Sequence, residues 1–236
     1  MPQPTIVFDF DGTLALGHGP VIAYAKHVGL AAQDPGLVDD ARAALERLDA
    51  GDGRYRDGYD AVRRVALARG VPETALGPAY LASRQELGTQ DAPVSAPVGL
   101  RDFLAALAQH ALLVLATNAP EIGVDRVLDQ AGVTHLLAER HFSIGKPDGL
   151  TAVVAQHVTH GPVLAVGDIW MNDLAPAAVL GADTALVGAT ARSTDADPTM
   201  RGSTLADLYG EITSWAATAV TGPTASTGAV HPHGKA

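Results

Sequence analysis

Four short runs of mainly apolar residues are spread along the chain. They cover residues 6–8, 112–116, 163–166 and 184–187, and they are rich in branched side chains without regular polar alternation. Runs of this kind are typical of strands buried on both faces, as in a parallel sheet. The first three end abruptly in polar groups, which are Asp9, then Thr117 and Asn118, then Gly167 and Asp168.

Helix-like stretches separate these runs, at residues 98–110, 121–131, 150–157 and 173–180. Alternating strands and helices predict an α/β fold, a doubly wound parallel sheet of the Rossmann-like kind. Ligands of such sheets bind beyond the carboxyl ends of the strands. We therefore expect the polar groups that follow the strands to converge on one site.

Residues 15–97 interrupt this alternation, because they contain helical patterns, as at 39–48 and 57–69, and no convincing buried strand. We interpret them as an inserted α-helical cap whose proline-containing exit, residues 92–97, forms a hinge. The catalytic core then comprises residues 1–14 and 98–216. Residues 217–236 are rich in Thr, Gly, Ala, Pro and Ser and are predicted to be a disordered C-terminal tail.

Composition excludes several classes of protein. The formal net charge of −10 argues against binding to nucleic acid or to an anionic membrane, since such partners require dense lysine and arginine. The chain has no cysteine, which removes disulfides, thiolate metal sites and cysteine nucleophiles. Without a charged, apolar leader or a long apolar stretch, the chain is expected to be soluble and cytoplasmic.

Asp9 and Asp11 lie two residues apart at the end of the first strand, so both carboxylates point to the same side of an extended chain. Gly12 then allows a turn. A calcium loop is excluded, because the glycine comes too early and no closing glutamate follows at the required spacing. On this motif alone, the residues could also form a simple turn from strand to loop with no role in chemistry.

Four motifs in order change that picture. They are Asp9-Phe10-Asp11-Gly12-Thr13, Thr117-Asn118, Gly145-Lys146-Pro147, and Gly167-Asp168 followed by Asn172-Asp173. Together they resemble the haloacid dehalogenase-like (HAD) hydrolase superfamily over roughly residues 5–190. The segment between the first two motifs is similar to the helical cap of the first type found in its phosphoglycolate phosphatase-like branch.

The resemblance implies a catalytic role for three residues. Asp9 would attack phosphorus and form an aspartyl-phosphate, while Asp11 would protonate the leaving group and later deprotonate water. Lys146 would neutralise charge beside the nucleophile. These are the nucleophile, the acid and the positive charge that phosphoryl transfer requires.

The remaining motif residues would bind phosphate and metal. The resemblance implies that Thr117 and the amide of Asn118 hold a phosphoryl oxygen. Mg²⁺ would bind Asp9, Asp168 and the main-chain carbonyl of Asp11. Two further residues would act just outside this shell, Thr13 and Asp173, the latter orienting Lys146 or a metal-bound water.

Counting charges shows why a cation is expected. Four carboxylates and one ammonium leave a net charge of −3, and each like-charged pair at about 4 Å costs about 4 kcal/mol at an effective dielectric constant of 20. Mg²⁺ together with a protonated Asp11 brings the site to zero. Hard oxygen ligands without competing histidine or thiolate suit Mg²⁺.

Substrate specificity is expected to come from the cap. Arg54, Tyr55 and Arg56 lie in a turn-rich segment that is either a substrate loop or a solvated connection between helices. His18, where the cap begins, would face the cleft or lie on the surface. If the loop is not the specificity element, His18 and Arg84 are the next residues to test.

These observations favour a Mg²⁺-dependent phosphatase that acts on a small phosphorylated metabolite. A 2-haloacid dehalogenase uses the same nucleophile but has no leaving oxygen for Asp11 to protonate. A sugar phosphomutase shares the core, and nothing in the cap excludes it. A non-catalytic binding or regulatory member of the fold would be indicated by eroded motifs, and none of the four is missing.

Overall fold

The computed structural model describes residues 3–188, 191 and 194–221, and its core is one parallel sheet. The strand order is β3-β2-β1-β4-β5-β6, so the first strand of the chain lies between β2 and β4. The strands are β1 (Thr5–Phe8), β2 (Leu112–Ala116), β3 (Glu139–His141), β4 (Val163–Gly167), β5 (Asp183–Leu186) and β6 (Met200–Arg201). The predicted doubly wound α/β fold is confirmed.

In β1, β2, β4 and β5, alternate residues enter two separate hydrophobic clusters, one on each face of the sheet. In β1, Ile6 and Phe8 pack on one face with helices α5 (Leu100–Leu107), α6 (Val124–Ala131) and α9 (Tyr209–Thr221). Val7 packs on the other face with α7 (Asp148–Val158) and α8 (Ala175–Val179). Burial on both faces explains why the strands read as continuous apolar runs.

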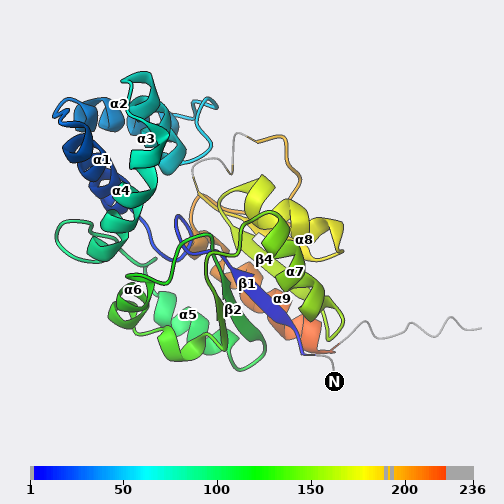
Figure 1. Cartoon of the computed structure of the whole chain (residues 1–236). Helices are drawn as coiled ribbons and strands as arrows, with labels where there is room; N and C mark the ends of the chain where they lie inside the picture. The colour runs from blue at the N-terminus through cyan, green and yellow to red at the C-terminus, as the bar shows by residue number, and fades with distance from the viewer. Residues whose placement is uncertain (1–2, 189–190, 192–193, 222–236) are drawn as a thin grey trace, which may run out of the picture.

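The inserted segment folds into a separate helical body, which we call the cap. It contains α1 (Gly19–Ala32), α2 (Leu37–Asp49), α3 (Gly58–Ala68) and α4 (Glu73–Glu86). Its buried apolar side chains form a cluster of their own, running from Val21 to Ala79. In Figure 1 the cap lies beyond the end of the sheet opposite the chain start marked N, so the carboxyl end of β1 points toward it.

The two connections between cap and core run side by side. Leu16 N donates to Ser95 O at 2.8 Å, and Ser95 N donates to Leu16 O at 3.0 Å. A Cβ atom at Gly19 would lie 2.0 Å from Pro93 O, so only glycine allows the entering chain to pass the exiting one this closely. The proline-containing exit therefore forms one joint with the entry.

Some elements differ from the predictions. β3 and β6 were not predicted, because β3 consists of Glu139, Arg140 and His141 and β6 has two residues. Residues 170–174 form a turn of π-helix ahead of α8, so the first two residues of the helix predicted at 173–180 belong to that turn. α9 continues to Thr221, beyond the predicted start of the tail at 217. The rest of the predicted tail, residues 222–236, lies outside the described residues.

None of the helices in the described part of the chain combines the length and the apolar character that a membrane span needs.

Candidate active site

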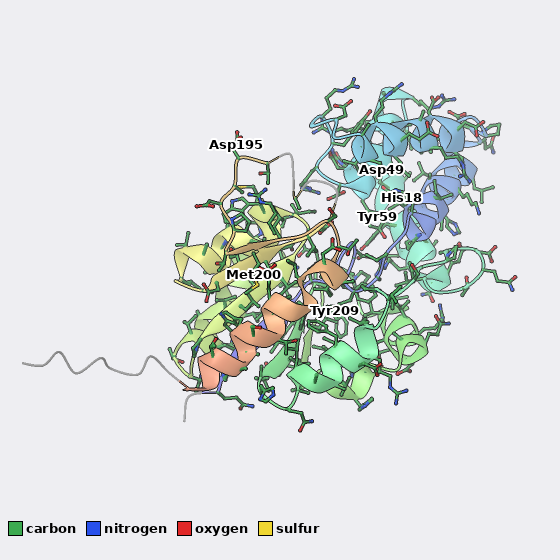
Figure 2. All side chains as sticks on the ribbon, turned by 180° about the vertical axis from the view of Figure 1, so that it is seen from behind. His18, Asp49, Tyr59, Asp195, Met200 and Tyr209 are labelled. Atoms are coloured by element: carbon green, nitrogen blue, oxygen red, sulfur yellow. The ribbon has the colours of Figure 1, made fainter. Side chains whose placement is uncertain are left out.

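A cavity of about 810 Å³ lies between the cap and the carboxyl ends of the strands. Figure 2 shows His18 and Tyr59 on the cap, whereas Met200 and Tyr209 lie on the core. Seven of the predicted core residues line this cavity: Asp9, Asp11, Thr117, Asn118, Lys146, Asp168 and Asp173. The four sequence motifs thus meet in one place, as the topology of the sheet predicts.

The loop after β1 passes very close to the loop after β4. Asp9 N still donates to Val166 O at 2.9 Å, so the ladder between the strands extends to this residue. Gly12 has a φ of +82°, and a Cβ atom there would lie 2.3 Å from Asp168 Oδ2. Glycine is required at this position both for the turn and for the approach of the Asp168 carboxylate.

Lys146 joins Asp9 to Asp173. Its Nζ donates to Asp9 Oδ1 and, at 2.7 Å, to Asp173 Oδ1, and its side chain is only 2% exposed. Asp173 Oδ2 accepts from Ile169 N at 2.9 Å, so both oxygens of this carboxylate are engaged. Although burial opposes a charged amine, the two carboxylates raise the pKa of Lys146 above its usual value.

Three carboxylates form an acidic cluster that can hold a metal ion. Asp9, Asp168 and Asp173 each offer an oxygen within 4.8 Å of the others. Burial, opposed by Lys146, raises the pKa of Asp9 to about 7, and burial with the neighbouring carboxylates raises the pKa of Asp168. Hard oxygen donors whose negative charges are buried together are a fitting site for Mg²⁺.

The residues after β2 hold the Lys146 loop in place. Asn118 Oδ1 accepts from Lys146 N at 2.6 Å, and Thr117 Oγ1 accepts from Ala119 N at 3.0 Å. Thr13 is fully buried, and within the described residues its hydroxyl has no hydrogen-bond partner. The structure brings Thr117, Asn118 and Lys146 together, as expected of a phosphate-binding group.

Arg84 of α4 reaches Asp11 from the cap. Its Nη1 donates to Asp11 Oδ1 at 3.1 Å and to Oδ2 at 3.3 Å, and also to the hydroxyl oxygen of Tyr59 at 3.0 Å. The arginine side chain is 0% exposed, and Asp11 is 32% exposed. Sequence reasoning named Arg84 only as a further cap residue to test, since a pair spanning 73 positions leaves no local pattern.

This arginine changes the charge count of the site. Four carboxylates, at Asp9, Asp11, Asp168 and Asp173, face the two cations Lys146 and Arg84, which gives a net charge of −2 rather than the −3 expected from the motifs. A divalent cation then brings the site to zero while Asp11 is still ionised.

The sequence model of the haloacid dehalogenase-like hydrolases matches residues 4–181, which is about three quarters of the chain. The chain belongs to this hydrolase family. Among curated proteins none matches it significantly.

Solved structures of this family share the fold at low identity. YfnB from Bacillus subtilis, described as a HAD-hydrolase bound to magnesium, is 16% identical, with a TM-score of 0.61 over 90% of this chain and 99% of its own. A predicted phosphoglycolate phosphatase from Haemophilus somnus is 19% identical, with a TM-score of 0.62 over 90% and 99%. The 2-haloacid dehalogenase from Pseudomonas syringae is 20% identical, with a TM-score of 0.54 over 91% and 100%.

The cap residues predicted for specificity in this HAD-like hydrolase fall into two groups. His18, Tyr55 and Arg56 line the cavity, whereas Arg54 is not among the described residues that line it. His18, Arg54 and Arg56 each already have an acidic partner. His18 bonds Asp49 at 2.9 Å, Arg54 Nε bonds Asp52 at 2.9 Å and Arg56 Nε bonds Asp57 at 3.0 Å.

Proposed function

We propose that this HAD-like hydrolase is a magnesium-dependent phosphatase that acts on a small phosphorylated metabolite through an aspartyl-phosphate. The observation that carries the proposal is the position of Asp11, which lines the same cavity as Asp9. The solved structures that share the fold include a predicted phosphoglycolate phosphatase and a 2-haloacid dehalogenase, so the fold does not decide between the two activities. A 2-haloacid has no leaving oxygen to protonate, so an acid beside the nucleophile favours phosphate chemistry over dehalogenation.

In the first step, a carboxylate oxygen of Asp9 attacks phosphorus, and the bond between phosphorus and the ester oxygen breaks. Asp11 gives its proton to that oxygen, and the substrate leaves as an alcohol. Lys146, which contacts Asp9, offsets negative charge on the transferring group. Thr117 and the amide of Asn118 bind a phosphoryl oxygen.

In the second step, water attacks the phosphorus of the aspartyl-phosphate. Asp11, now a carboxylate, accepts a proton from this water, and the bond between phosphorus and Asp9 breaks. Inorganic phosphate leaves, and Asp9 is a carboxylate again. Over the two steps Asp11 loses one proton and regains one, so the enzyme returns to its starting state.

The metal would be held by Asp9, Asp168 and the carbonyl oxygen of Asp11. When bound, Mg²⁺ supplies positive charge that lets an anionic phosphate approach the carboxylates. Asp173 would act outside this shell, because one of its oxygens already accepts from Lys146 and the other from Ile169 N. This assignment makes Asp173 an orienting residue for Lys146.

The cavity walls favour a compact substrate with a cyclic or apolar part. On the cap side they include Tyr55, Tyr59 and Tyr80, and the rings of Tyr59 and Tyr80 contact each other edge to face at 5.3 Å. The volume of about 810 Å³ is within the usual range of small-molecule sites. Nucleic acid and membranes are not proposed as partners, because the net charge of −10 opposes both.

A phosphatase screen tests this function. It should cover sugar phosphates, phosphoglycolate, nucleoside monophosphates and phosphoamino acids, each with Mg²⁺ and with EDTA, and with Asp9→Asn as the control. We expect phosphate release from at least one alkyl phosphate with Mg²⁺ and none with EDTA. Full turnover in EDTA, or halide release from a 2-haloacid in place of phosphate release, would contradict the proposal.

A further inference from the structure

A charged side chain of the cap is completely buried against the catalytic core. Arg84 lies in the last turn of α4, and its side chain is 0% exposed. A buried guanidinium needs a partner, because removing a charge from water is costly. Its charged partner in the structure is Asp11, and this contact exists only while the cap is docked on the core.

The polar contacts of this guanidinium are made through one nitrogen. Nη1 donates to both oxygens of Asp11 and to Tyr59, whereas Nε and Nη2 have no hydrogen-bond partner among the described residues. The guanidinium also lies 6.0 Å from the centre of the Phe10 ring. Phe10 lies between Asp9 and Asp11 in the sequence. The guanidinium of Arg84 therefore contacts the side chains of two neighbouring residues of the first motif, Phe10 and Asp11.

We propose that Arg84 is a positioning residue that holds the carboxylate of Asp11 where it can exchange a proton with the leaving oxygen. This inference rests on the proposed phosphatase function. Arg84 is not among the described residues that line the cavity, so it acts through Asp11 and does not touch the substrate. Because Arg84 belongs to the cap, Asp11 is then held in position for proton transfer only when the cap is docked.

A merely structural contact at the same junction provides a matched control. Arg126 of α6 donates from Nη1 to the carbonyl oxygens of Gln85 and Leu87, at 3.1 and 2.6 Å. It therefore ties the core to the end of α4 without contacting Asp11. If Arg84 only fastened the cap, Arg126→Gln and Arg84→Gln would have the same kinetic effect.

The test compares two substrates that differ in their need for a proton. An alkyl phosphate requires an acid for its leaving oxygen, whereas 4-nitrophenyl phosphate has a good leaving group and requires it much less. In Arg84→Gln we expect kcat/KM for the alkyl phosphate to fall at least about tenfold more than for the aryl phosphate. Arg84→Lys should recover part of this difference, and Arg126→Gln should leave the ratio unchanged.

A double variant shows whether Arg84 acts through Asp11. In an Asp11→Asn background, Arg84→Gln should cause no further change in the ratio of the two substrates. Equal losses on both substrates, a further loss in the Asp11→Asn background, or the same effect from Arg126→Gln would overturn the inference. If Arg84→Gln does not fold in a melting experiment, Arg84→Lys carries the same comparison.

The two proposals fail in different ways. A wild-type protein that hydrolyses neither substrate contradicts the phosphatase function itself. A wild-type protein that hydrolyses both, with an unchanged ratio in the Arg84 variants, contradicts only the role given to Arg84.

Discussion

Asp9 and Asp11 are chemically identical residues placed in different surroundings. Asp9 is 9% exposed and is contacted by Lys146, which lies between it and Asp173. Asp11 is 32% exposed and is contacted by an arginine of the cap. Two carboxylates with different surroundings can take two roles, one as nucleophile and one as acid and base.

Asparagine substitutions should separate these roles. Asp9→Asn removes the nucleophile, so we expect no turnover of any phosphate ester. Asp11→Asn removes the acid, so kcat/KM for an alkyl phosphate should fall about 10²–10⁴-fold, and much less for an aryl phosphate. Steady-state kinetics on one substrate of each type checks this. Equal losses on both would leave Asp11 as a metal or positioning group only.

The pKa of Asp9 makes the stability of the metal-free protein depend on pH. Burial raises this pKa from 3.8 to about 7. Between about pH 4 and pH 7 the unfolded chain loses this proton while the folded chain keeps it, so the free energy of unfolding decreases as pH rises. Melting curves in EDTA should show a Tm that falls over this range more steeply for wild type than for Asp9→Asn. If Tm changes with pH in the same way for both proteins, the raised pKa is not that of Asp9. Mg²⁺ should make the Tm of wild type fall less steeply with pH.

At the scale of elements, we expect the segment between α2 and α3 to recognise a second anionic group of the substrate. Arg54 and Arg56 are both exposed, at 66% and 62%, and both are paired with neighbouring aspartates. Only Arg56 lines the cavity, as far as the described residues show. Of the two arginines predicted to bind a second anion, Arg56 is therefore the candidate, and Arg54 serves as its control.

Single alanine variants test this difference. Arg56→Ala should lower kcat/KM for a phosphate ester that carries a carboxylate, such as phosphoglycolate, about tenfold, because one exposed charged hydrogen bond is lost. Arg54→Ala should change it less than about twofold. The measurement compares both variants on phosphoglycolate and 4-nitrophenyl phosphate, with a melting curve for each. If both variants behave alike, the segment does not recognise the substrate.

Elements with a strong local pattern were predictable from the sequence, whereas those decided by tertiary contacts were not. β1, β2, β4 and β5 are buried on both faces and appear as apolar runs, and the groups that follow three of them converge as expected. β3 has polar residues at an edge of the sheet, so its pattern is weak. The pair between Arg84 and Asp11 depends on how α4 docks on the core, which no local pattern encodes.

The described residues form two bodies that share no apolar cluster and meet over the candidate active site. Within the cap, Tyr24, Tyr59 and Tyr80 contact one another, so the wall that faces the site is part of a packed cluster. We therefore expect the cap to move as a rigid unit, and a ligand that contacts both bodies to stabilise the whole chain.

Beryllium fluoride with Mg²⁺ tests the proposed aspartyl-phosphate, because it imitates a phosphorylated aspartate. At about 100 times its dissociation constant, a ligand that binds only the folded state adds about 2.7 kcal/mol, which is roughly 5–10 °C in Tm for a chain of this size. Differential scanning fluorimetry should show this shift for wild type and no shift for Asp9→Asn. A wild-type protein without a shift would count against the aspartyl-phosphate.

The two hydrogen bonds between Leu16 and Ser95 mark a place where the inserted cap could be exchanged for another. Because they bring the ends of the long insertion together, the chain enters and leaves the insertion at one place on the core, as it would for a short surface loop. Domains inserted at such points are tolerated, since the scaffold need not open to receive them. A different set of helices spliced between these two residues would leave Asp9, Lys146 and Asp168 in place and bring a new choice of substrate, but it would have to supply its own partner for Asp11 in place of Arg84.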